Sequence, residues 1–290
     1  MYNTDKFLLA GVMGWPVSHS RSPIMHNHWI MENKLTGLYL PIAVKPSGLS
    51  SALSMLKPLG FAGCNITIPH KQTALEIVDA SDEIARTIGA ISCITVQKDG
   101  SLLGTNNDWY GFIENLKQET PKWRADAGPV LVIGSGGASR AICYGLIREG
   151  AKEIRIVNRT YSKACDLAKV FGKTVKPIPW NKRNEALKDV ALVANTTSQG
   201  MTGTSPLDIC LKRLPLSAIV TDTIYTPLNT PFLKSAKLRG NHIVNGLGML
   251  FHQGVPAWKQ WFNIEPVVSE KLRKKTLLVE RGKSEDFEGP

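Results

Sequence analysis

Residues 130–140 read VLVIGSGGASR, and this stretch decides the fold of the second half of the chain. An apolar, β-branched run passes directly into a glycine-rich turn, and the helix-forming sequence AICYGLIREG follows. Glycines allow a tight turn and a close approach of backbone to a pyrophosphate, and the following helix offers free N–H groups. The pattern across Gly134, Gly136 and Ser139 is G-x-G-x-x-S, with a small residue in place of the third glycine. Alone, such a turn also fits an ordinary strand-to-helix connection.

The next apolar run separates these two interpretations. Enzymes that use NAD carry an Asp or Glu about twenty residues beyond the turn, on the adenosine ribose. Here the run ends Asn158-Arg159-Thr160, with no carboxylate to repel a phosphate. The guanidinium of Arg159 can pair with a 2′-phosphate, and Thr160 and Lys163 add donors. The sequence therefore predicts an NADP(H) site.

Composition and charge exclude several classes of protein. The 290 residues are 43% hydrophobic and 20% charged, which is typical of a folded globular protein. No run approaches the roughly 20 apolar residues of a membrane helix, and no signal peptide is recognisable, so we expect a cytoplasmic protein without a membrane partner. The net charge of +11 comes without a basic, aromatic-lined helix, so it suits an anionic cofactor rather than nucleic acid. The five scattered cysteines predict free thiols and no metal site.

Apolar runs alternate with amphipathic helical stretches, which predicts an α/β fold with mostly parallel sheets. We expect an N-terminal α/β substrate domain followed by a Rossmann-type, doubly wound parallel-sheet domain that binds NADP. The expected boundaries are residues 1–108 with 247–265 for the substrate-binding and catalytic domain, and 109–246 for the NADP domain. The polar, proline-bounded segment 121–129 is the best linker candidate, and residues 266–290 are expected to form a charged, partly loose tail.

Local signals predict three further features. Ser22 before Pro23 predicts a helix with a hydroxyl cap. The run 98–100, Lys-Asp-Gly, lies between two β-branched stretches and predicts a hairpin. His26 and His28 are two apart on the expected helix and so point to different faces, which argues against a shared metal ion.

Lys71 and Asp108 are the candidate acid–base pair. A carbonyl that accepts a hydride needs a proton donor near the developing alkoxide. Lys71 ends the stretch ITIPHK and Asp108 ends GTNND, each directly after an apolar strand sequence. A carboxylate can position the ammonium, and partial burial eases exchange of its proton. Taken singly, a surface lysine and a helix cap stay open as alternatives.

These motifs together resemble shikimate dehydrogenases over most of residues 6–265. They are GWPVSHSRSPIMHN from Gly14, NITIPHK from Asn65, GTNNDWYGF ending at Phe112, GSGGASRA, NRTYSK, NTTSQGM from Asn195, DTIYTP from Asp222 and GLGMLFHQ ending at Gln253. Several separate motifs in one order are far more specific than any one of them. The resemblance implies an enzyme that reversibly reduces 3-dehydroshikimate to shikimate with NADPH, in the chorismate route to aromatic amino acids.

The resemblance also implies roles for individual residues. Lys71 is the implied acid/base residue, with Asp108 orienting it. The implied substrate contacts are Ser20, Ser22, Thr67, Ser92, Asp108, Tyr225 and Gln253. The implied cofactor contacts are Glu83, Gly134, Ser135, Gly136, Gly137, Ala138, Asn158, Arg159, Thr160, Lys163, Thr223 and Gly246. The expected partner is this small-molecule substrate, and both a monomer and a homodimer stay open.

Three positions depart from the family's pattern. The family usually reads G-A-x-N-T where this chain has Ser92 in place of the amide, and N-T-D where it has Asn107 in the middle. Asn245 stands where an acid usually precedes the final glycine. A serine hydroxyl has a shorter reach than a carboxamide, so we expect weakened affinity for shikimate or a shifted substrate preference. A paralogous quinate or amino-sugar dehydrogenase and a non-catalytic NADP-binding paralogue stay open as alternatives.

Overall fold

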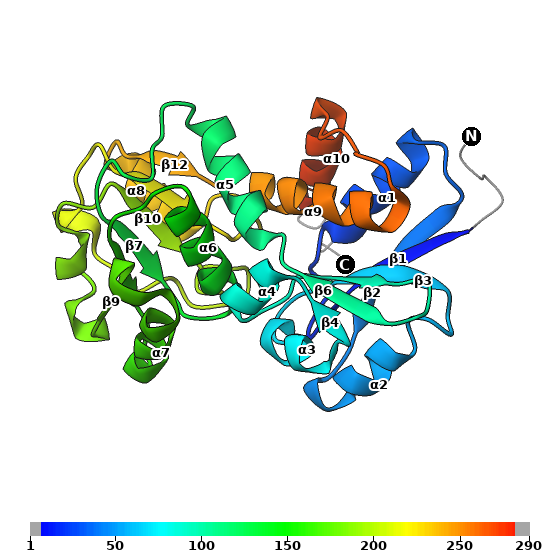
Figure 1. The fold of residues 1–290 in the computed structure, drawn as a ribbon. Coiled ribbons are helices and arrows are strands. Elements are labelled where there is room, and N and C mark those ends of the chain that lie inside the picture. Colours follow the sequence, from blue (N-terminus) through cyan, green and yellow to red (C-terminus); the bar gives the residue numbers. More distant parts are fainter. Residues whose placement is uncertain (1–6, 282–290) are drawn as a thin grey trace, which may run out of the picture. The chain divides into compact units, whose positions relative to one another are not determined.

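The computed structural model describes residues 7–281. The chain divides into two compact units (Figure 1), of which the first comprises the residues up to Asn107 and those from Gln253 onward. The second unit runs from Asp108 to His252. Each unit contains one six-stranded sheet with helices on both faces. The α/β fold class predicted from the sequence is confirmed.

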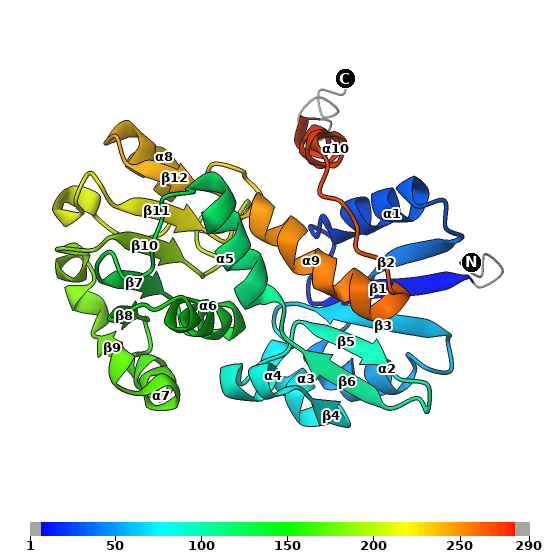
Figure 2. The same cartoon turned by 45° about the horizontal axis from the view of Figure 1, so that its top comes forward.

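The sheet of the first unit is mixed. Its strands are β1 (Leu8–Gly14), β2 (Gly37–Ala43), β3 (Phe61–Ile66), β4 (Ala80–Ser81), β5 (Cys93–Val96) and β6 (Leu102–Thr105). Their spatial order is β2-β1-β3-β5-β6-β4, and β5 alone runs antiparallel to its neighbours. The hairpin predicted around residues 98–100 is β5–β6 (Figure 2), closed by a 2.8 Å hydrogen bond from the N–H of Gln97 to the carbonyl of Ser101. Because β5 is reversed, it begins at the edge where β1, β3 and β6 end.

Helices cover both faces of this sheet. They are α1 (Ser22–Glu32), the short 3₁₀ helix η1 (Pro46–Gly48), α2 (Leu49–Ser54), α3 (Lys71–Ile77), α4 (Glu83–Ile88), α10 (Glu270–Arg281) and the part of α9 (Leu247–Phe262) that follows His252. On one face, apolar residues of α2, α3 and α4 form a buried cluster with the strands. On the other face, the indole N–H of Trp261 in α9 donates to the carbonyl of Ile94 in β5 over 2.9 Å. The first unit is therefore a three-layer sandwich.

The structure describes a helix, α10, in the segment after Pro266, where the sequence predicted only a charged, partly loose tail. α10 packs against α1, and Leu272 and Thr276 are buried. Arg21 donates to the carbonyl of Thr276 over 3.3 Å, and the indole of Trp29 donates to the carbonyl of Val267 over 2.9 Å. This helix was not predicted from the sequence EKLRKKTLLVER, because its few inward-facing residues are separated by basic ones. Residues 282–290 lie outside the described residues.

The sheet of the second unit is entirely parallel. Its strands are β7 (Val130–Ile133), β8 (Ile154–Val157), β9 (Val175–Ile178), β10 (Leu192–Asn195), β11 (Ile219–Asp222) and β12 (His242–Val244). The spatial order is β12-β11-β10-β7-β8-β9, so consecutive strands move outward from β7 in one direction and from β10 in the other. This is the order of a Rossmann domain, in which ligands bind where the direction reverses. The doubly wound parallel sheet predicted from the sequence is confirmed.

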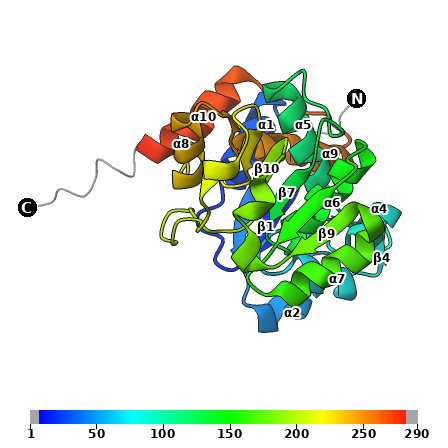
Figure 3. The same ribbon diagram turned by 90° about the vertical axis from the view of Figure 1, so that its left-hand side faces the viewer.

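Helices cover both faces of this sheet (Figure 3). The helices are α5 (Asp108–Glu119), α6 (Gly137–Arg148), α7 (Tyr161–Phe171), α8 (Pro231–Leu238) and the start of α9, with 3₁₀ helices η2 (Gly172–Thr174), η3 (Trp180–Lys182), η4 (Glu185–Leu187) and η5 (Leu211–Arg213). Val130 and Val132 join the cluster that includes α5, α6 and α7, whereas Leu131 and Ile133 join the cluster with α8. Successive strand residues point to opposite faces, so a run of apolar residues supplies both layers at once.

The polar segment 121–129 does not link the two units, so the linker prediction is wrong. It lies within the second unit and joins α5 to β7. Ala125 is buried in the core cluster there, and Trp123 packs against the same cluster. The boundary between the units falls instead at Asn107 and Asp108, where β6 passes into α5 with hardly a turn. A change of composition at 121–129 marks a surface loop rather than a domain boundary.

Candidate functional site

The candidate substrate residues of the first unit lie beside one edge of its sheet. Parallel strands bring their carboxyl ends to a common edge, and ligands of α/β proteins bind outside those ends. Around this edge the structure places Ser20 between β1 and α1, Ser22 at the start of α1, Thr67 and Lys71 after β3, Ser92 before β5, and Asn106 and Asn107 after β6. These residues are up to 87 positions apart in the numbering, and it is the sheet order that gathers them.

The serine pair is built around the first turn of α1. Helix α1 begins at Ser22 itself, so the prediction of Ser22 as the hydroxyl cap is wrong. Instead the hydroxyl of Ser20 accepts a 3.3 Å hydrogen bond from the N–H of Ser22. Thr67 is tied to the neighbouring strand because its N–H donates to the carbonyl of Met13 over 2.9 Å. The segments after β1 and β3 are therefore fixed side by side.

Lys71 is held by its backbone from two sides. It is the first residue of α3, and its carbonyl accepts a 2.9 Å hydrogen bond from the N–H of Ile91. The preceding residue, His70, is buried, and its Nε2 lies 2.7 Å from the carbonyl of Val44. The N–H of His70 also donates to the carbonyl of Thr67 over 2.9 Å. These contacts position Lys71 at the edge of the sheet, with its side chain half-buried.

Ser92 connects the ends of three strands. Its carbonyl accepts from the N–H of Ile66 and its own N–H donates to the carbonyl of Thr105, both over 2.9 Å. The side chain is buried, and its hydroxyl accepts a 2.8 Å hydrogen bond from the N–H of Asn107. The residue that replaces the family's amide therefore fastens β5 to the end of β6.

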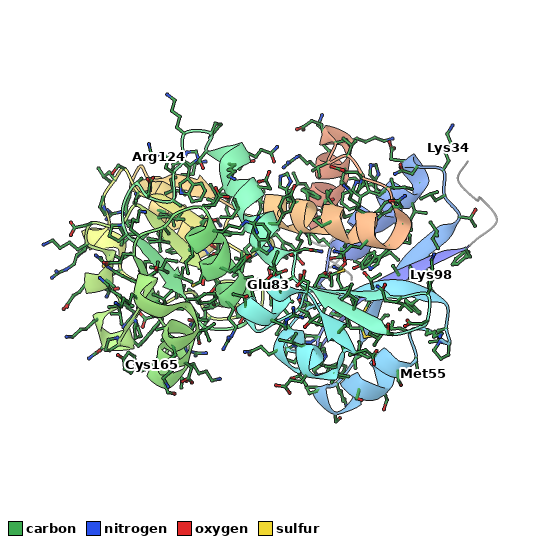
Figure 4. All side chains as sticks on the ribbon, in the orientation of Figure 1. Lys34, Met55, Glu83, Lys98, Arg124 and Cys165 are labelled. Atoms are coloured by element: carbon green, nitrogen blue, oxygen red, sulfur yellow. The ribbon has the colours of Figure 1, made fainter. Side chains whose placement is uncertain are left out.

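The other predicted substrate and acid–base residues are placed as follows. Asp108 is buried as the first residue of α5 in the second unit, and Gln253 is half-buried in α9 as part of the first. Tyr225 is half-buried in the segment after β11 in the second unit. Glu83 lies exposed on the first turn of α4 (Figure 4), where a negative charge favours the start of a helix. This helix-start role alone accounts for an acid at position 83.

The glycine-rich turn follows β7, next to the strand at which the order of the second sheet reverses. Gly134 has a φ of +111°, and a Cβ there would stand 2.7 Å from the hydroxyl oxygen of Thr196. Ser139 is buried, and its hydroxyl lies 2.5 Å from that of Thr196, which in turn donates to the carbonyl of Ile133 over 2.6 Å. The serine in place of the third glycine thus forms a hydrogen bond between α6 and the residue that follows β10.

The space beside this turn is open. A Cβ built on Gly136 would meet no atom within 4 Å, and no side chain caps the first turn of α6. Ser135, Gly137 and Ala138 complete the turn and are half-exposed. Uncapped N–H groups at the positive end of a helix can bind an anion such as a pyrophosphate.

Two cations follow β8. Arg159 and Lys163 are exposed, as is Thr160, which immediately precedes α7. The side-chain amide of Asn158 donates to the carbonyl of Thr160 over 2.8 Å and so shapes this turn. Residues 158–163 contain no carboxylate. The predicted group thus lies on the turn after β8 and the first residues of α7.

Thr223 and Gly246 approach each other closely. The N–H of Thr223 donates to the carbonyl of Asn195 over 3.0 Å, which extends the line of β11. A Cβ on Gly246 would overlap the carbonyl oxygen of Thr223, so a larger residue would push this segment apart. Asn245 accepts a 3.0 Å hydrogen bond from the N–H of Leu247 and so starts α9. An amide oxygen serves that purpose as well as the usual acid.

Metal-binding clusters and membrane helices were also sought within residues 7–281. In that range no group of three or more His, Cys, Asp and Glu side chains is arranged to hold a metal ion. No helix of the range is both long and apolar enough to cross a membrane. The five cysteines are free thiols, and Cys64, Cys93 and Cys143 are buried.

Comparisons with known proteins agree with this architecture. The family model described as the shikimate dehydrogenase substrate binding domain matches residues 12–94, and that of shikimate / quinate 5-dehydrogenase matches residues 116–207. A shikimate dehydrogenase (NADP(+)) of Paramagnetospirillum magneticum is 48% identical over 93% of this chain and 98% of that protein. This chain belongs to the shikimate dehydrogenase family.

Solved structures of the family extend the comparison. Shikimate 5-dehydrogenase from Thermus thermophilus, in complex with NADP(H) and shikimate, has a TM-score of 0.83 and 32% identity, covering 93% of this chain and 99% of that one. Quinate dehydrogenase from Corynebacterium glutamicum, in complex with NAD, has a TM-score of 0.85 and 27% identity, covering 94% and 100%. The shared fold spans both units of the chain.

Asp222 is a buried carboxyl that holds the segment after β11 in place, and the sequence analysis assigned it no role. It is 1% exposed, and it accepts hydrogen bonds from the N–H of Ile224 at 3.0 Å, the amide of Asn195 at 3.1 Å and the hydroxyl of Thr230 at 2.8 Å. Burial raises the pKa of this carboxyl to about 6, against the opposing effect of the three donors. Asp222 fixes the segment that carries Tyr225, and its place in the motif DTIYTP was the only signal available.

Replacing Asp222 by asparagine is expected to change how stability depends on pH. A carboxyl whose pKa is raised on folding stabilises the native state below its ordinary pKa, and this contribution is lost as pH rises toward about 6. Two pKa units correspond to about 3 kcal/mol. The free energy of unfolding of the wild type, relative to that of D222N, should therefore fall by about this amount between pH 4 and pH 7. Urea unfolding across that range measures the difference, and a pH-independent difference would contradict the expectation.

Proposed function

We propose that this member of the shikimate dehydrogenase family reversibly reduces 3-dehydroshikimate to shikimate with NADPH, in the biosynthesis of aromatic amino acids. The observation that carries the proposal is the set of polar groups gathered beside one edge of the first sheet. Hydroxyls of Ser20, Ser22 and Thr67 can donate to a carboxylate and to ring hydroxyls, and Lys71 begins the helix that follows the end of β3. Such a set suits a small, polyhydroxylated carboxylic acid.

Lys71 is the proposed acid and base. When NADPH is bound, it supplies the hydride for the carbonyl carbon. Negative charge then develops on the carbonyl oxygen, and the ammonium of Lys71 donates the proton that completes the alcohol. In the reverse direction the amine of Lys71 takes the hydroxyl proton. Asp108 keeps the role that the family resemblance implies, as orienting partner of Lys71 and ligand of a ring hydroxyl. Tyr225 and Gln253 keep their implied substrate contacts.

The cofactor would be held by the second unit. The open space beside Gly136 and the uncapped first turn of α6 fit a pyrophosphate. The residues proposed to hold the cofactor are Gly134, Ser135, Gly136, Gly137 and Ala138 at the pyrophosphate, Asn158, Arg159, Thr160 and Lys163 at the adenosine end, and Thr223 and Gly246 at the nicotinamide end. Glu83 keeps only its implied place near the cofactor. Two cations, Arg159 and Lys163, and the absence of a carboxylate from residues 158–163 favour NADP over NAD.

Replacing Arg159 by alanine is expected to raise KM for NADPH by about 10- to 100-fold. A charged hydrogen bond to a phosphate contributes about 1.5 to 3 kcal/mol, and each 1.4 kcal/mol is tenfold in affinity. KM for NADH should stay within a factor of two, because NADH lacks the 2′-phosphate. Lys173→Ala, at an exposed cation in η2, serves as the control. Equal losses with both cofactors would contradict the assignment of Arg159 to the 2′-phosphate.

The function is tested by following nicotinamide absorbance with shikimate or quinate, each offered NADP⁺ and NAD⁺. The expected result is the highest kcat/KM with shikimate and NADP⁺. A quinate dehydrogenase is the second candidate, because Ser92 replaces an amide at the substrate edge and a quinate dehydrogenase shares the fold. Preference for quinate would establish that candidate. An absence of turnover with all four pairs would leave only a non-catalytic NADP-binding protein.

We further propose a cytoplasmic enzyme that acts as a monomer or a homodimer. A reducing compartment suits the five free thiols, two of which, Cys165 and Cys210, are not buried. Sedimentation at micromolar concentration distinguishes the monomer from the homodimer. Cell fractionation with a cytoplasmic marker tests the compartment, and recovery in an oxidising compartment would contradict it.

A further inference from the structure

The side chain of Asn107 is an unusual group at the substrate edge of the first unit. The residue is only 7% exposed, and it directly follows Asn106 at the end of β6. Its amide nitrogen is buried and has no hydrogen-bond partner within the described residues. Burying an amide without a partner sacrifices its hydrogen bonds to water and recovers nothing in the unliganded protein. Such a group calls for a specific explanation.

The side chain of the neighbouring residue, Asn106, differs from that of Asn107 because it has a structural hydrogen bond. Asn106 is 2% exposed, and its side-chain nitrogen donates to the carbonyl of Ala90 over 2.8 Å. Asn106 thus donates a side-chain hydrogen bond within the first unit, whereas the side-chain nitrogen of Asn107 has no acceptor within the described residues. The unused donor belongs to the residue that immediately precedes Asp108.

Ser92 fixes where this donor is presented. Its hydroxyl oxygen accepts a 2.8 Å hydrogen bond from the backbone N–H of Asn107, and the ladder to Thr105 and Ile66 holds Ser92 itself. The short side chain at position 92 is therefore used to hold the backbone at position 107. Position 92 lacks a carboxamide, but Asn107, which follows the neighbouring strand β6, has one.

We infer that the carboxamide of Asn107 is a substrate-binding group, whose nitrogen donates to an oxygen on the ring of a polyhydroxylated carboxylic acid. Ser92 is the positioning residue that presents it. This inference rests on the proposed function and deepens it. It also predicts that the carboxamide of Asn107 takes the place of the amide that position 92 lacks, so that the protein retains its affinity for the substrate.

The test compares Asn107→Leu with Asn106→Leu in the full-length protein. Leucine has nearly the shape of asparagine but no polar atoms. We expect N107L to leave Tm unchanged or raised in the absence of ligand, because an unpaired donor is removed. The same variant should raise KM and the calorimetric Kd for shikimate by about 10- to 100-fold while the Kd for NADP⁺ stays constant. The control N106L, which breaks the bond to Ala90, should lower Tm.

Ser92→Ala and the double variant test the positioning role. S92A should raise KM for shikimate, and S92A with N107L should have the KM of N107L alone within a factor of two, because Ser92 acts through Asn107. Additive losses would overturn this role and give Ser92 a substrate contact of its own. A fall in Tm of N107L as large as that of N106L, or a KM and Kd within a factor of two of wild type, would overturn the inference.

Failure of the proposed function gives a different pattern. If wild type prefers quinate, the same variants measured with quinate decide the role of Asn107, because that substrate is also a hydroxylated ring acid. If wild type binds shikimate without turnover, the calorimetric Kd decides it. If wild type neither binds nor turns over either acid, both the function and the inference are wrong.

Discussion

Replacing Lys71 by alanine is expected to lower kcat for shikimate oxidation by about 10²- to 10⁴-fold, the range attributed to a well-placed acid or base. The Kd of NADP⁺ should not change, because the residues proposed to hold its pyrophosphate, adenosine and nicotinamide lie in the second unit of the chain. The loss has a direct cause. Without an ammonium at the first position of α3, the alkoxide formed or consumed in the reaction must exchange its proton with water.

Two further substitutions separate proton transfer from charge. Lys71→Arg keeps a cation but not a group that gives up its proton, so kcat should remain low while KM changes little. Lys98→Ala removes an exposed lysine in the turn between β5 and β6 (Figure 4), at the opposite end of the hairpin from Ser92, and should match wild type. Stopped-flow absorbance under saturating substrate measures the chemical step. A K71A variant as fast as wild type would remove Lys71 from the mechanism.

The second sheet could be predicted because its central strands are buried on both faces. β7 is a continuous apolar run, β10 and β11 begin with apolar residues, and the glycine turn after β7 marks the first of these strands. β9 was not predicted, and its sequence VKPI shows why. It is the edge strand, where Lys176 and Pro177 are tolerated because one side of the strand has no neighbour to bond.

The candidate site was predictable only where a residue type and a motif coincide. Lys71 could be predicted as a candidate because a cation after a strand is a chemical signal in the sequence. The role inferred for Asn107 could not be predicted, because it depends on a backbone hydrogen bond to Ser92, 15 residues away, and on a side-chain nitrogen left without a partner within the described residues. Likewise the role of Asp222 could not be predicted, because it depends on three hydrogen-bond donors that only the structure shows. Partners distant in sequence decide these roles, and no local pattern records them.

Protonation of His26 is expected to destabilise the first unit in acid. The imidazole is 1% exposed, stacks on Tyr39 with 4.0 Å between ring centroids, and accepts a 2.7 Å hydrogen bond at Nδ1 from the indole of Trp258. A ring that accepts at Nδ1 carries its proton on Nε2 and is neutral. Burial lowers the pKa of His26 from 6.5 to about 3, because a charged imidazolium in this aromatic cluster would lack water.

The pH window follows from this direction of the pKa change. Between pH 6.5 and about 3 the unfolded chain binds a proton at His26 that the folded chain does not. The stabilisation is therefore complete above pH 6.5 and is lost as pH falls. Each pH unit is worth about 1.4 kcal/mol, and the whole window about 5 kcal/mol. Asp222 acts in the opposite sense over part of the same window, so only a variant of one residue isolates its contribution.

His26→Phe should remove this dependence. The variant keeps an aromatic ring against Tyr39 but leaves the indole N–H of Trp258 without its acceptor, so at pH 7.5 it should be about 1 to 3 kcal/mol less stable than wild type. From pH 6.5 to 4.5 the wild type should lose about 3 kcal/mol more than H26F, and the two curves should meet or cross. Trp258→Phe is the matched control, because it removes the same hydrogen bond and retains the histidine. Urea unfolding of the three proteins at intervals of one pH unit measures these differences. If H26F has the same acid slope as W258F, the histidine is not the titrating group, and the acid sensitivity of the first unit belongs to other residues.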